Sequence, residues 1–370
     1  MRFFFRVSGT FVCTLLSIVY VLCSLPAYIS STTWARFSLF ALLFPYMAGL
    51  MFVAIIYFLF RNRRLAIFLI LVSFIGYKNI STTFAFHPFS PWNNNKQRGS
   101  FRILTWNVQG FDNLSGKKAQ EEPGWLQVLE QVKQWQPDIA CLQEYKTVIE
   151  HKKLVDMKDR FDSAGYKYFY CSKDYISTTY NGVKIVHGVA IFSKLPLIDS
   201  GTVIIQNEGG YIEKMAYADL QLDNRRMRIF TAHLASYQLY SEQTYIENRT
   251  YQETIEHKRS IIGKIQQREL MHEQQVKTIR KSIEASPYPV IYCGDLNNTP
   301  ASYTYHYLRG NMQDAWLKKG LGLGKTFYNL APSLRIDVCL ADAAFQVQQS
   351  VVKRVYSSDH FPVLTDISWK

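Results

Sequence analysis

Residues 290–297 read VIYCGDLN, a short apolar run that ends in Gly294, Asp295 and Asn297. Runs rich in Val, Ile and Tyr favour a buried β-strand, and the glycine permits a tight turn after it. A polar side chain also follows four other apolar runs, in Thr105-Trp106-Asn107, Leu142-Gln143-Glu144, Thr231-Ala232-His233 and Ser358-Asp359-His360. One such residue is usually just a solvated turn residue. Five in order along one domain predict that these side chains meet at one rim of a β-sandwich.

Short apolar runs bounded by turn residues continue from residue 101 to the end of the chain. They predict strands at 101–106, 139–143, 166–170, 189–192, 215–222, 226–233, 290–293, 336–340 and 363–367. Two longer stretches, 124–134 and about 251–285, predict helices that end before a proline. Acidic and basic residues interleave along the second helix, which indicates a solvated amphipathic face. Many strands with few helices between them predict two packed β-sheets with helices outside.

Seven motifs occur in order in this part of the chain. They are TWNVQ (105–109), LQE (142–144), HGVAIFSK (187–194), TAHL (231–234), GDLNNTP (294–300), RIDVCL (335–340) and SDHFPV (358–363). The series resembles the endonuclease/exonuclease/phosphatase superfamily, which includes deoxyribonuclease-like nucleases, abasic-site endonucleases, inositol polyphosphate 5-phosphatases and neutral sphingomyelinases. The resemblance implies a four-layered α/β sandwich, in which two packed mixed β-sheets are flanked by helices and the active site lies at one end.

The resemblance also implies a metal site. Phosphate esters repel hydroxide, so their hydrolysis needs a cation that neutralises charge. Asn107 and Glu144 match the family's metal pair, with Asp359 assisting. Their hard oxygen atoms suit Mg2+, and Mn2+ could replace it.

Catalytic roles follow from the same resemblance. Asp295 is expected to orient or deprotonate the attacking water, and Asn297 to donate a hydrogen bond to the phosphate. His360 would stabilise the phosphoryl oxygens as an imidazolium, with Asp337 holding its ring. His233 resembles the histidine of the phosphatase, sphingomyelinase and deoxyribonuclease branches, which argues against an abasic-site endonuclease.

The first 96 residues differ sharply in charge from the rest. They contain no Asp or Glu, and their eight Lys and Arg residues carry +8 of the formal net charge of +13. The remaining +5 is a mild excess for a soluble domain, so the overall basic composition is weak evidence for nucleic-acid binding. The excess of basic residues belongs instead to a region with long apolar runs.

These apolar runs predict a membrane region at residues 1–86 with three transmembrane helices, at about 7–25, 37–60 and 65–86. Residues 87–100 are then a linker and 101–370 the catalytic domain. The cluster Arg61, Arg63 and Arg64 predicts a cytoplasmic loop. Three spans would therefore place the catalytic domain on the non-cytoplasmic side of the inner (plasma) membrane. A third segment that is re-entrant or interfacial would leave that domain in the cytoplasm.

The sequence therefore predicts an integral membrane enzyme of bacterial type that hydrolyses phosphate esters with magnesium. A phosphodiesterase or phosphatase acting on lipid headgroups or small phosphate esters is favoured, because tethering concentrates the site at the bilayer. The partners are then the lipid bilayer and the phosphate-ester substrate, and no obligate protein partner is inferred. The first alternative is a membrane-anchored metal-dependent nuclease. A catalytically silent phosphate-binding module is the second, although each motif position holds a chemically competent side chain.

Overall fold

The computed structural model describes residues 2–111, 124–149, 156–179, 182–208, 211–222, 224–237, 251–329 and 331–370. The chain forms two compact units, neither of which is continuous in sequence. The first unit contains Met1–Phe84, Ser236–Glu273 and Asn298–His306. The second contains Ala85–Ala235, Gln274–Asn297 and Tyr307–Lys370.

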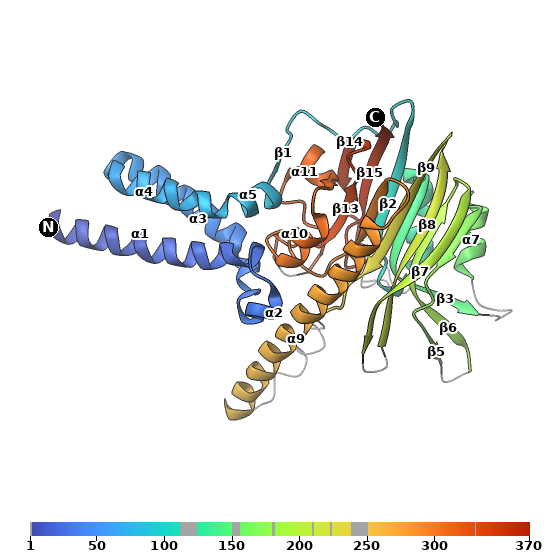
Figure 1. Ribbon diagram of the computed structural model, residues 1–370, viewed down its shortest axis with the longest axis horizontal. Coiled ribbons are helices and arrows are strands. Elements are labelled where there is room, and N and C mark those ends of the chain that lie inside the picture. The colour runs from blue at the N-terminus through green and yellow to red at the C-terminus, as the bar shows by residue number, and fades with distance from the viewer. Residues whose placement is uncertain are drawn as a thin grey trace. The chain divides into compact units, whose positions relative to one another are not determined.

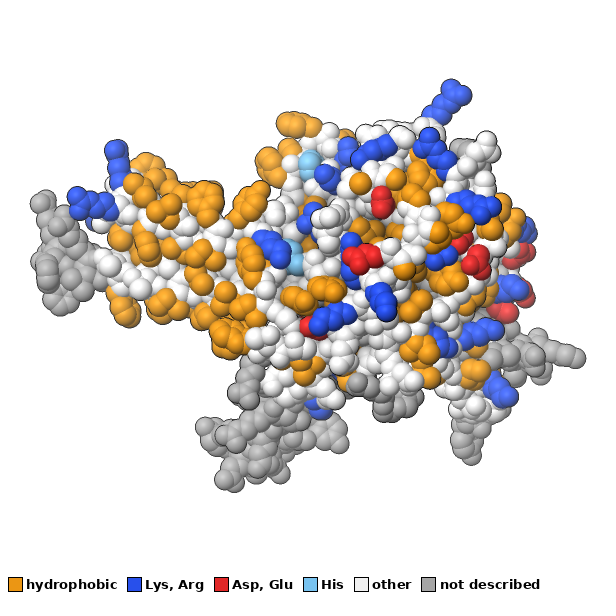
Figure 2. Space-filling model, viewed as in Figure 1, with side chains coloured by type: hydrophobic (Ala, Val, Ile, Leu, Met, Phe, Trp, Pro, Cys, Tyr) orange, Lys and Arg blue, Asp and Glu red, His pale blue; other side chains and the backbone are white. Residues whose placement is uncertain are grey.

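The first unit is built on helices, most of them apolar. They are α1 (Arg2–Ser24), α3 (Phe40–Arg61), α4 (Arg63–Ser73) and α5 (Tyr77–Thr83), with η1 (Leu25–Ala27), α2 (Ser31–Trp34), η2 (Ala35–Phe37) and η3 (Phe74–Gly76) between them. Helix α3 packs against both α1 and α4 (Figure 1). Many of the side chains coloured on the visible face of these helices are hydrophobic (Figure 2). Such a surface is typical of helices that contact lipid rather than water.

Three helical stretches are long and apolar enough to cross a membrane, at Gly9–Ala27, Phe40–Arg61 and Arg63–Thr83. The third begins and ends two or three residues earlier than the sequence indicated, because Asn62 caps its start and the chain becomes extended at Phe84. An ordinary helix–helix turn at Asn62 thus separates the second stretch from the third. The spans of the membrane region are candidates by length and composition.

The second unit contains two mixed β-sheets. In the first, β14 (Phe345–Val352), β15 (Val363–Trp369), β2 (Ser100–Asn107), β3 (Ile139–Ile149), β6 (Lys184–Ser193) and β4 (Tyr168–Cys171) lie in that order, and β5 (Tyr175–Thr178) also pairs with β6. In the second the order is β11 (Gln313–Asp314), β13 (Asp337–Ala341), β10 (Val290–Asp295), β9 (Arg225–His233), β8 (Tyr211–Leu222) and β7 (Leu197–Glu208). A separate short pair joins β1 (Ala85–Phe86) to β12 (Leu321–Gly322).

The two sheets pack face to face around one apolar core, to which Ile103 and Ile191 contribute from one sheet and Ile229 and Ile291 from the other. A second core lies on the outer face of the first sheet, beneath α6 (Gly124–Trp135) and α7 (Met157–Ser163). The remaining helices of this part are η4 (Gln109–Phe111), α11 (Ala315–Lys319), the C-terminal third of α9 (Tyr251–Glu284) and the end of α10 (Tyr303–Arg309). This arrangement of helices outside two packed sheets confirms the predicted α/β sandwich (Figure 1).

The expected linker, residues 87–100, has no regular secondary structure before β2 begins at Ser100. It is nevertheless bound to the second unit. The backbone N–H of Asn93 donates to Gln349 Oε1 at 2.8 Å, and Lys96 Nζ lies 2.6 Å from Asp138 Oδ2. The segment is therefore anchored along its length.

Candidate active site

Most of the expected site residues lie where the central strands end, and Glu144 lies within β3 at an irregularity of its pairing. Strands β9 and β10 run parallel, and their register places His233 directly beside Asp295. On its other side Asp295 is paired with Asp337, the first residue of β13. Strands β2 and β3 also run parallel, with Asn107 opposite Gln143. The carboxyl ends of parallel strands share one edge of a sheet, so the fold itself gathers these side chains.

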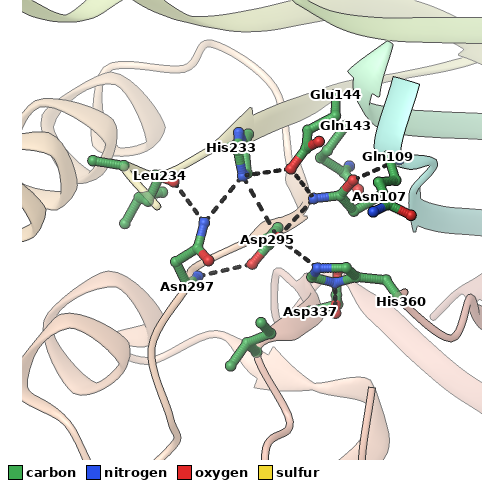
Figure 3. A network of polar contacts seen from close by, with 12 residues as sticks. Asn107, Gln109, Gln143, Glu144, His233, Leu234, Asp295, Asn297, Asp337 and His360 are labelled. Atoms are coloured by element: carbon green, nitrogen blue, oxygen red, sulfur yellow. Dashed lines mark hydrogen bonds and ion pairs between the residues drawn. The ribbon is translucent and has the colours of Figure 1, made fainter. Parts of the chain in front are cut away.

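Asp295 lies at the centre of a polar network (Figure 3). Its Oδ2 accepts a hydrogen bond from Asn107 Nδ2 at 3.0 Å and lies 3.7 Å from His233 Nε2 and 3.6 Å from His360 Nε2. The same Asn107 nitrogen donates to Glu144 Oε1 at 3.0 Å. One carboxylate from the second sheet therefore meets groups from both sheets.

Two members of the network have left-handed backbone conformations that non-glycine residues rarely adopt. Glu144 has φ 50° and lies in an irregularity of the β3–β6 pairing, between Leu142 and Tyr145. Such β-bulges re-aim a side chain and are common next to active sites. Asn297 has φ 47°, and its backbone N–H donates to Asp295 Oδ1 at 2.8 Å. Strained backbone of this kind concentrates at functional sites.

His360 and Asp337 form a close buried pair, with Nδ1 of the ring 2.9 Å from Asp337 Oδ2. Burial alone would lower the pKa of His360, but the negative charges of Asp337 and Asp295 outweigh it and raise the pKa to about 10. Burial raises the pKa of Asp337 to about 6, against the opposing effect of His360. An imidazolium–carboxylate pair therefore exists across neutral pH. The Nε2 atom of His360 points towards Asp295.

His233 and Glu144 are the more accessible members, with side chains 20% and 37% exposed. Their nearest atoms, His233 Nε2 and Glu144 Oε1, lie 3.6 Å apart. Burial lowers the pKa of His233, while the charges of Asp295 and Glu144 raise it by more, so that the net shift is upward. Asn297 Nδ2 lies 3.0 Å from His233 Nε2 and donates to the carbonyl oxygen of Leu234 at 2.7 Å. A substrate can approach the network from the side of these residues.

Asp359 and Ser358 complete the loop that carries His360. Ser358 Oγ contacts the carbonyl oxygen of Asn107 at 2.7 Å and Asp359 Oδ1 at 3.3 Å, which fixes this loop to the end of β2. Burial raises the pKa of Asp359, the charge of His360 opposes this shift, and the charges of Glu144 and Asp295 add to it. The charges of the network therefore affect the pKa of Asp359.

Gln143 is a member of the site that the sequence analysis did not single out. It is fully buried, and its Nε2 donates to Thr231 Oγ1 at 2.9 Å and to Thr105 Oγ1 at 3.1 Å. Each of these three residues precedes a residue of the network by one or two positions, and together they join the two sheets behind it. The signal in the sequence was a polar side chain at or near the end of each of three apolar runs.

We expect Gln143→Met to lower kcat by about ten- to hundredfold, because the change removes the link that holds Asn107, Glu144 and His233 in register. The near-isosteric apolar side chain leaves the volume of the site filled. Steady-state kinetics with a chromogenic phosphodiester would measure the effect. An unchanged kcat at native secondary structure would show that the link is dispensable.

The oxygen atoms of the network are suitable ligands for a hard divalent cation. Glu144 Oε1 and Asp295 Oδ2 converge on one small volume, since both contact the same Asn107 nitrogen. Ligand atoms of Asp295, Asp337 and His360 also lie within 4.8 Å of one another, but the charged His360 ring has no free lone pair for a cation. Asn107 Oδ1, the atom expected to bind a metal, accepts a hydrogen bond from the N–H of Gln109 at 3.0 Å. Carboxylate oxygen atoms in this number match the preferences of magnesium and manganese.

Comparison with known proteins agrees with this geometry. A sequence model described as the Endonuclease/Exonuclease/phosphatase family matches residues 104–360. A second, described as a domain of unknown function (DUF8431), matches residues 2–83. No curated protein matches the sequence.

Several solved structures share the fold. An endonuclease/exonuclease/phosphatase from Beutenbergia cavernae DSM 12333 has a TM-score of 0.54 at 17% identity, over 74% of this chain and 72% of that chain. The catalytic domain of human Nocturnin, solved with a bound sulfate anion, has a TM-score of 0.51 at 19% identity, over 74% of this chain and 95% of that one. A family protein from Bacteroides thetaiotaomicron has a TM-score of 0.51 at 14% identity, over 75% and 97% of the two chains.

The family match covers well over half of the chain and includes Asn107, Glu144, His233 and Asp295. Members of this family are phosphoester hydrolases, among them nucleases and phosphatases, and they generally use divalent metal ions. The chain belongs to the Endonuclease/Exonuclease/phosphatase family and is a hydrolase of phosphate esters.

Proposed function

We propose that this chain is a membrane-anchored, magnesium-dependent phosphodiesterase or phosphatase that acts on lipid headgroups or small phosphate esters at the membrane surface. The observation that carries the proposal is the position of Asp295, which lies between two histidines and the Asn107–Glu144 pair. Three candidate spans in the same chain support a site held near a bilayer. Tethering raises the local concentration of lipid substrates and favours them over dilute soluble esters.

Asp295 is proposed to take a proton from the attacking water. Its Oδ1 is fixed by the N–H of Asn297 at 2.8 Å, which leaves Oδ2 as the atom that faces the network. The water oxygen then forms its bond to phosphorus as the bond between phosphorus and the leaving-group oxygen breaks. A base held in this way needs no reorganisation during the reaction.

The histidines and Asn297 are proposed to bind the phosphoryl group. His360 is held as an imidazolium by Asp337, so its Nε2–H can donate to an oxygen that gains negative charge. His233 Nε2 and Asn297 Nδ2 lie 3.0 Å apart and present a second pair of groups on the accessible side. These donors would stabilise charge that develops on the phosphoryl oxygens.

Glu144 is the proposed principal ligand of the metal, with Asn107 beside it and Asp359 assisting. When bound, a divalent cation neutralises phosphoryl charge and polarises the ester. The Asn107 amide group lies where the two carboxylates converge and reduces their mutual repulsion in the structure. The left-handed backbone at Glu144 supports this role because it turns the carboxylate towards Asn107.

Chelation tests the metal and the substrate together. We expect EDTA to lower hydrolysis by about a hundredfold, and added Mg2+ or Mn2+ to restore it. The measurement is a panel of phospholipids, sphingomyelin, phosphoinositides, nucleotides and DNA, with the full-length protein in lipid nanodiscs. Glu144→Gln should raise the metal concentration needed for half-maximal rate. Full activity in EDTA would reject metal dependence, and preference for DNA would favour the nuclease alternative.

We also propose that three spans place the catalytic residues on the non-cytoplasmic side of the inner membrane. The turn between the first two spans is held by helix α9, since Ser30 Oγ donates to Glu273 Oε1 at 2.7 Å. A chain that crossed only twice before the domain would put this turn and α9 on opposite sides of the bilayer. The contact therefore supports a third crossing, with Arg61, Arg63 and Arg64 in the cytoplasm.

Cysteine labelling would test this topology, since the six native cysteines are all buried. We expect a membrane-impermeant maleimide to label Asn95→Cys in intact cells, whereas Asn62→Cys should react only after lysis. Both positions lie in described, non-helical parts of the chain. Labelling of Asn62→Cys in intact cells, with Asn95→Cys protected, would reverse the assignment.

A further inference from the structure

Helix α9 carries two buried carboxylates in its central turns. Glu269 and Glu273 are one helical turn apart and are 3% and 1% exposed. Both belong to the first unit, together with the apolar helices. A buried carboxylate is tolerated only where hydrogen-bond donors replace the lost water. The identity of those donors shows what the helix holds in place.

Glu273 holds the turn between the first two candidate spans. Ser30 Oγ lies 2.7 Å and 2.6 Å from its two carboxylate oxygens, and the N–H of Thr32 donates to Oε2 at 2.8 Å. Thr32 Oγ1 adds a contact of 3.3 Å to Oε1. We call residues 30–32 the membrane turn. Its backbone and its side chains are both bound to α9.

Glu269 joins the membrane turn to two other segments. Ser31 Oγ donates to its Oε2 at 3.3 Å, and Asn298 Nδ2 donates to its Oε1 at 3.0 Å. The hydroxyl of Tyr237 also donates to Oε1, and its ring is packed edge-on against His272. One carboxylate therefore binds three segments that are far apart in the sequence.

Two of these segments directly follow residues of the catalytic network in the sequence. Tyr237 lies four residues after His233, and Asn298 immediately follows Asn297. The segment 298–306 is held a second time at the end of the third span, where Thr82 Oγ1 donates to the carbonyl oxygen of Pro300 at 3.0 Å.

We propose that Glu269 is a positioning residue that couples the membrane segment to the active site. It fixes the start of both chain segments that follow His233 and Asn297, and its carboxylate is fully satisfied only when the membrane turn is in place. Loss of the turn would leave buried carboxylate oxygens without donors and would loosen both segments. Folding of the anchor thereby becomes a condition for full activity. This inference rests on the proposed function for its kinetic readout.

The test uses full-length protein in nanodiscs with a chromogenic phosphodiester and Mg2+. We expect Ser30→Ala combined with Ser31→Ala, two changes in the membrane turn alone, to lower kcat about tenfold with little change in KM. Glu269→Gln should have a similar effect. Tyr237→Phe removes one hydrogen-bond donor to Glu269 and leaves the buried charge intact. Adding Glu269→Gln to the turn variant should cost less than the sum of the separate losses, because both disrupt one network.

Two matched controls should retain the wild-type kcat. Glu284→Gln makes the same change on an exposed part of α9, where the side chain is 61% exposed. Ser81→Ala removes an exposed hydroxyl from the third span. This hydroxyl contacts the carbonyl oxygen of Lys78. Hydrogen exchange supplies a readout independent of catalysis. Amides of 231–237 and 296–306 should exchange faster in the turn variant, while those of β2 and β10 stay protected.

The outcomes separate this inference from the proposed function. Wild-type kcat and unchanged exchange in the turn variants, with Asp295→Asn inactive, would refute the coupling and leave the enzyme assignment standing. A wild-type protein that hydrolyses no ester of the panel would refute the proposed function. In that case faster exchange at 231–237 and 296–306 would still support the coupling, and unchanged exchange would reject it.

Discussion

Asp295→Asn is expected to lower kcat by about a thousandfold, the loss typical of removing a positioned base. Asparagine keeps the size of the side chain and can still accept from the N–H of Asn297. It cannot take a proton from water, and it brings an N–H group towards the two histidines. Rates with a chromogenic phosphodiester, compared with the wild type at saturating Mg2+, would measure the effect.

Asp162→Asn is the matched control for this prediction. Asp162 forms an exposed ion pair with Lys167 at 3.0 Å, and such pairs contribute little to stability. The control should therefore behave as the wild type. An Asp295→Asn variant with native secondary structure and unchanged kcat would remove Asp295 from the mechanism.

Asp337→Asn is expected to lower activity at pH 8 by about a hundredfold and to move the alkaline limb of the pH profile to lower pH. In the wild type the pKa of His360, raised to about 10, keeps the ring charged until the pH passes that value. Without the Asp337 charge, burial is opposed only by Asp295 and Asp359, so the pKa of His360 falls. The imidazolium is then lost at a lower pH than in the wild type, so the deficit should be smallest at acidic pH.

The pH profile of kcat, recorded from pH 5.5 to 10.5, distinguishes this effect from general damage to the site. His360→Gln supplies the comparison, because it removes the titrating ring: the rate should fall at every pH, and the alkaline limb that the ring produces should disappear. If the alkaline limb of Asp337→Asn coincides with that of the wild type, the pairing of these two residues does not set the charge of the ring.

The strands that carry the site could be predicted because each is an apolar run that ends in a polar residue. The run 290–293 lengthens only to Val290–Asp295 in the structure, and the strand predicted at 226–233 becomes Arg225–His233. Strands Leu197–Glu208 and Phe345–Val352 escaped prediction because polar residues interrupt their apolar pattern. Both lie at sheet edges, where one flank needs no partner strand.

Other features of the site depend on contacts that no local pattern contains. The left-handed conformation of Glu144 arises from an irregular pairing between β3 and β6, whose partners are about forty residues apart. The interpretation of helix 251–285 as a solvated face is wrong for Glu269 and Glu273, which are buried. Their donors, Ser30 and Ser31, lie more than two hundred residues away in sequence. The pattern of charges along a helix does not show which distant segments pack against that helix.

At position 144, the residue that gives the highest thermal stability differs from the residue that catalysis requires. Glycine or asparagine adopts a φ of 50° with less strain than glutamate, so either would relax this part of the chain. Both also remove the carboxylate that faces Asn107. Directed evolution of this chain for survival at high temperature would therefore tend to enrich inactive proteins at this position, unless each round also selects for turnover.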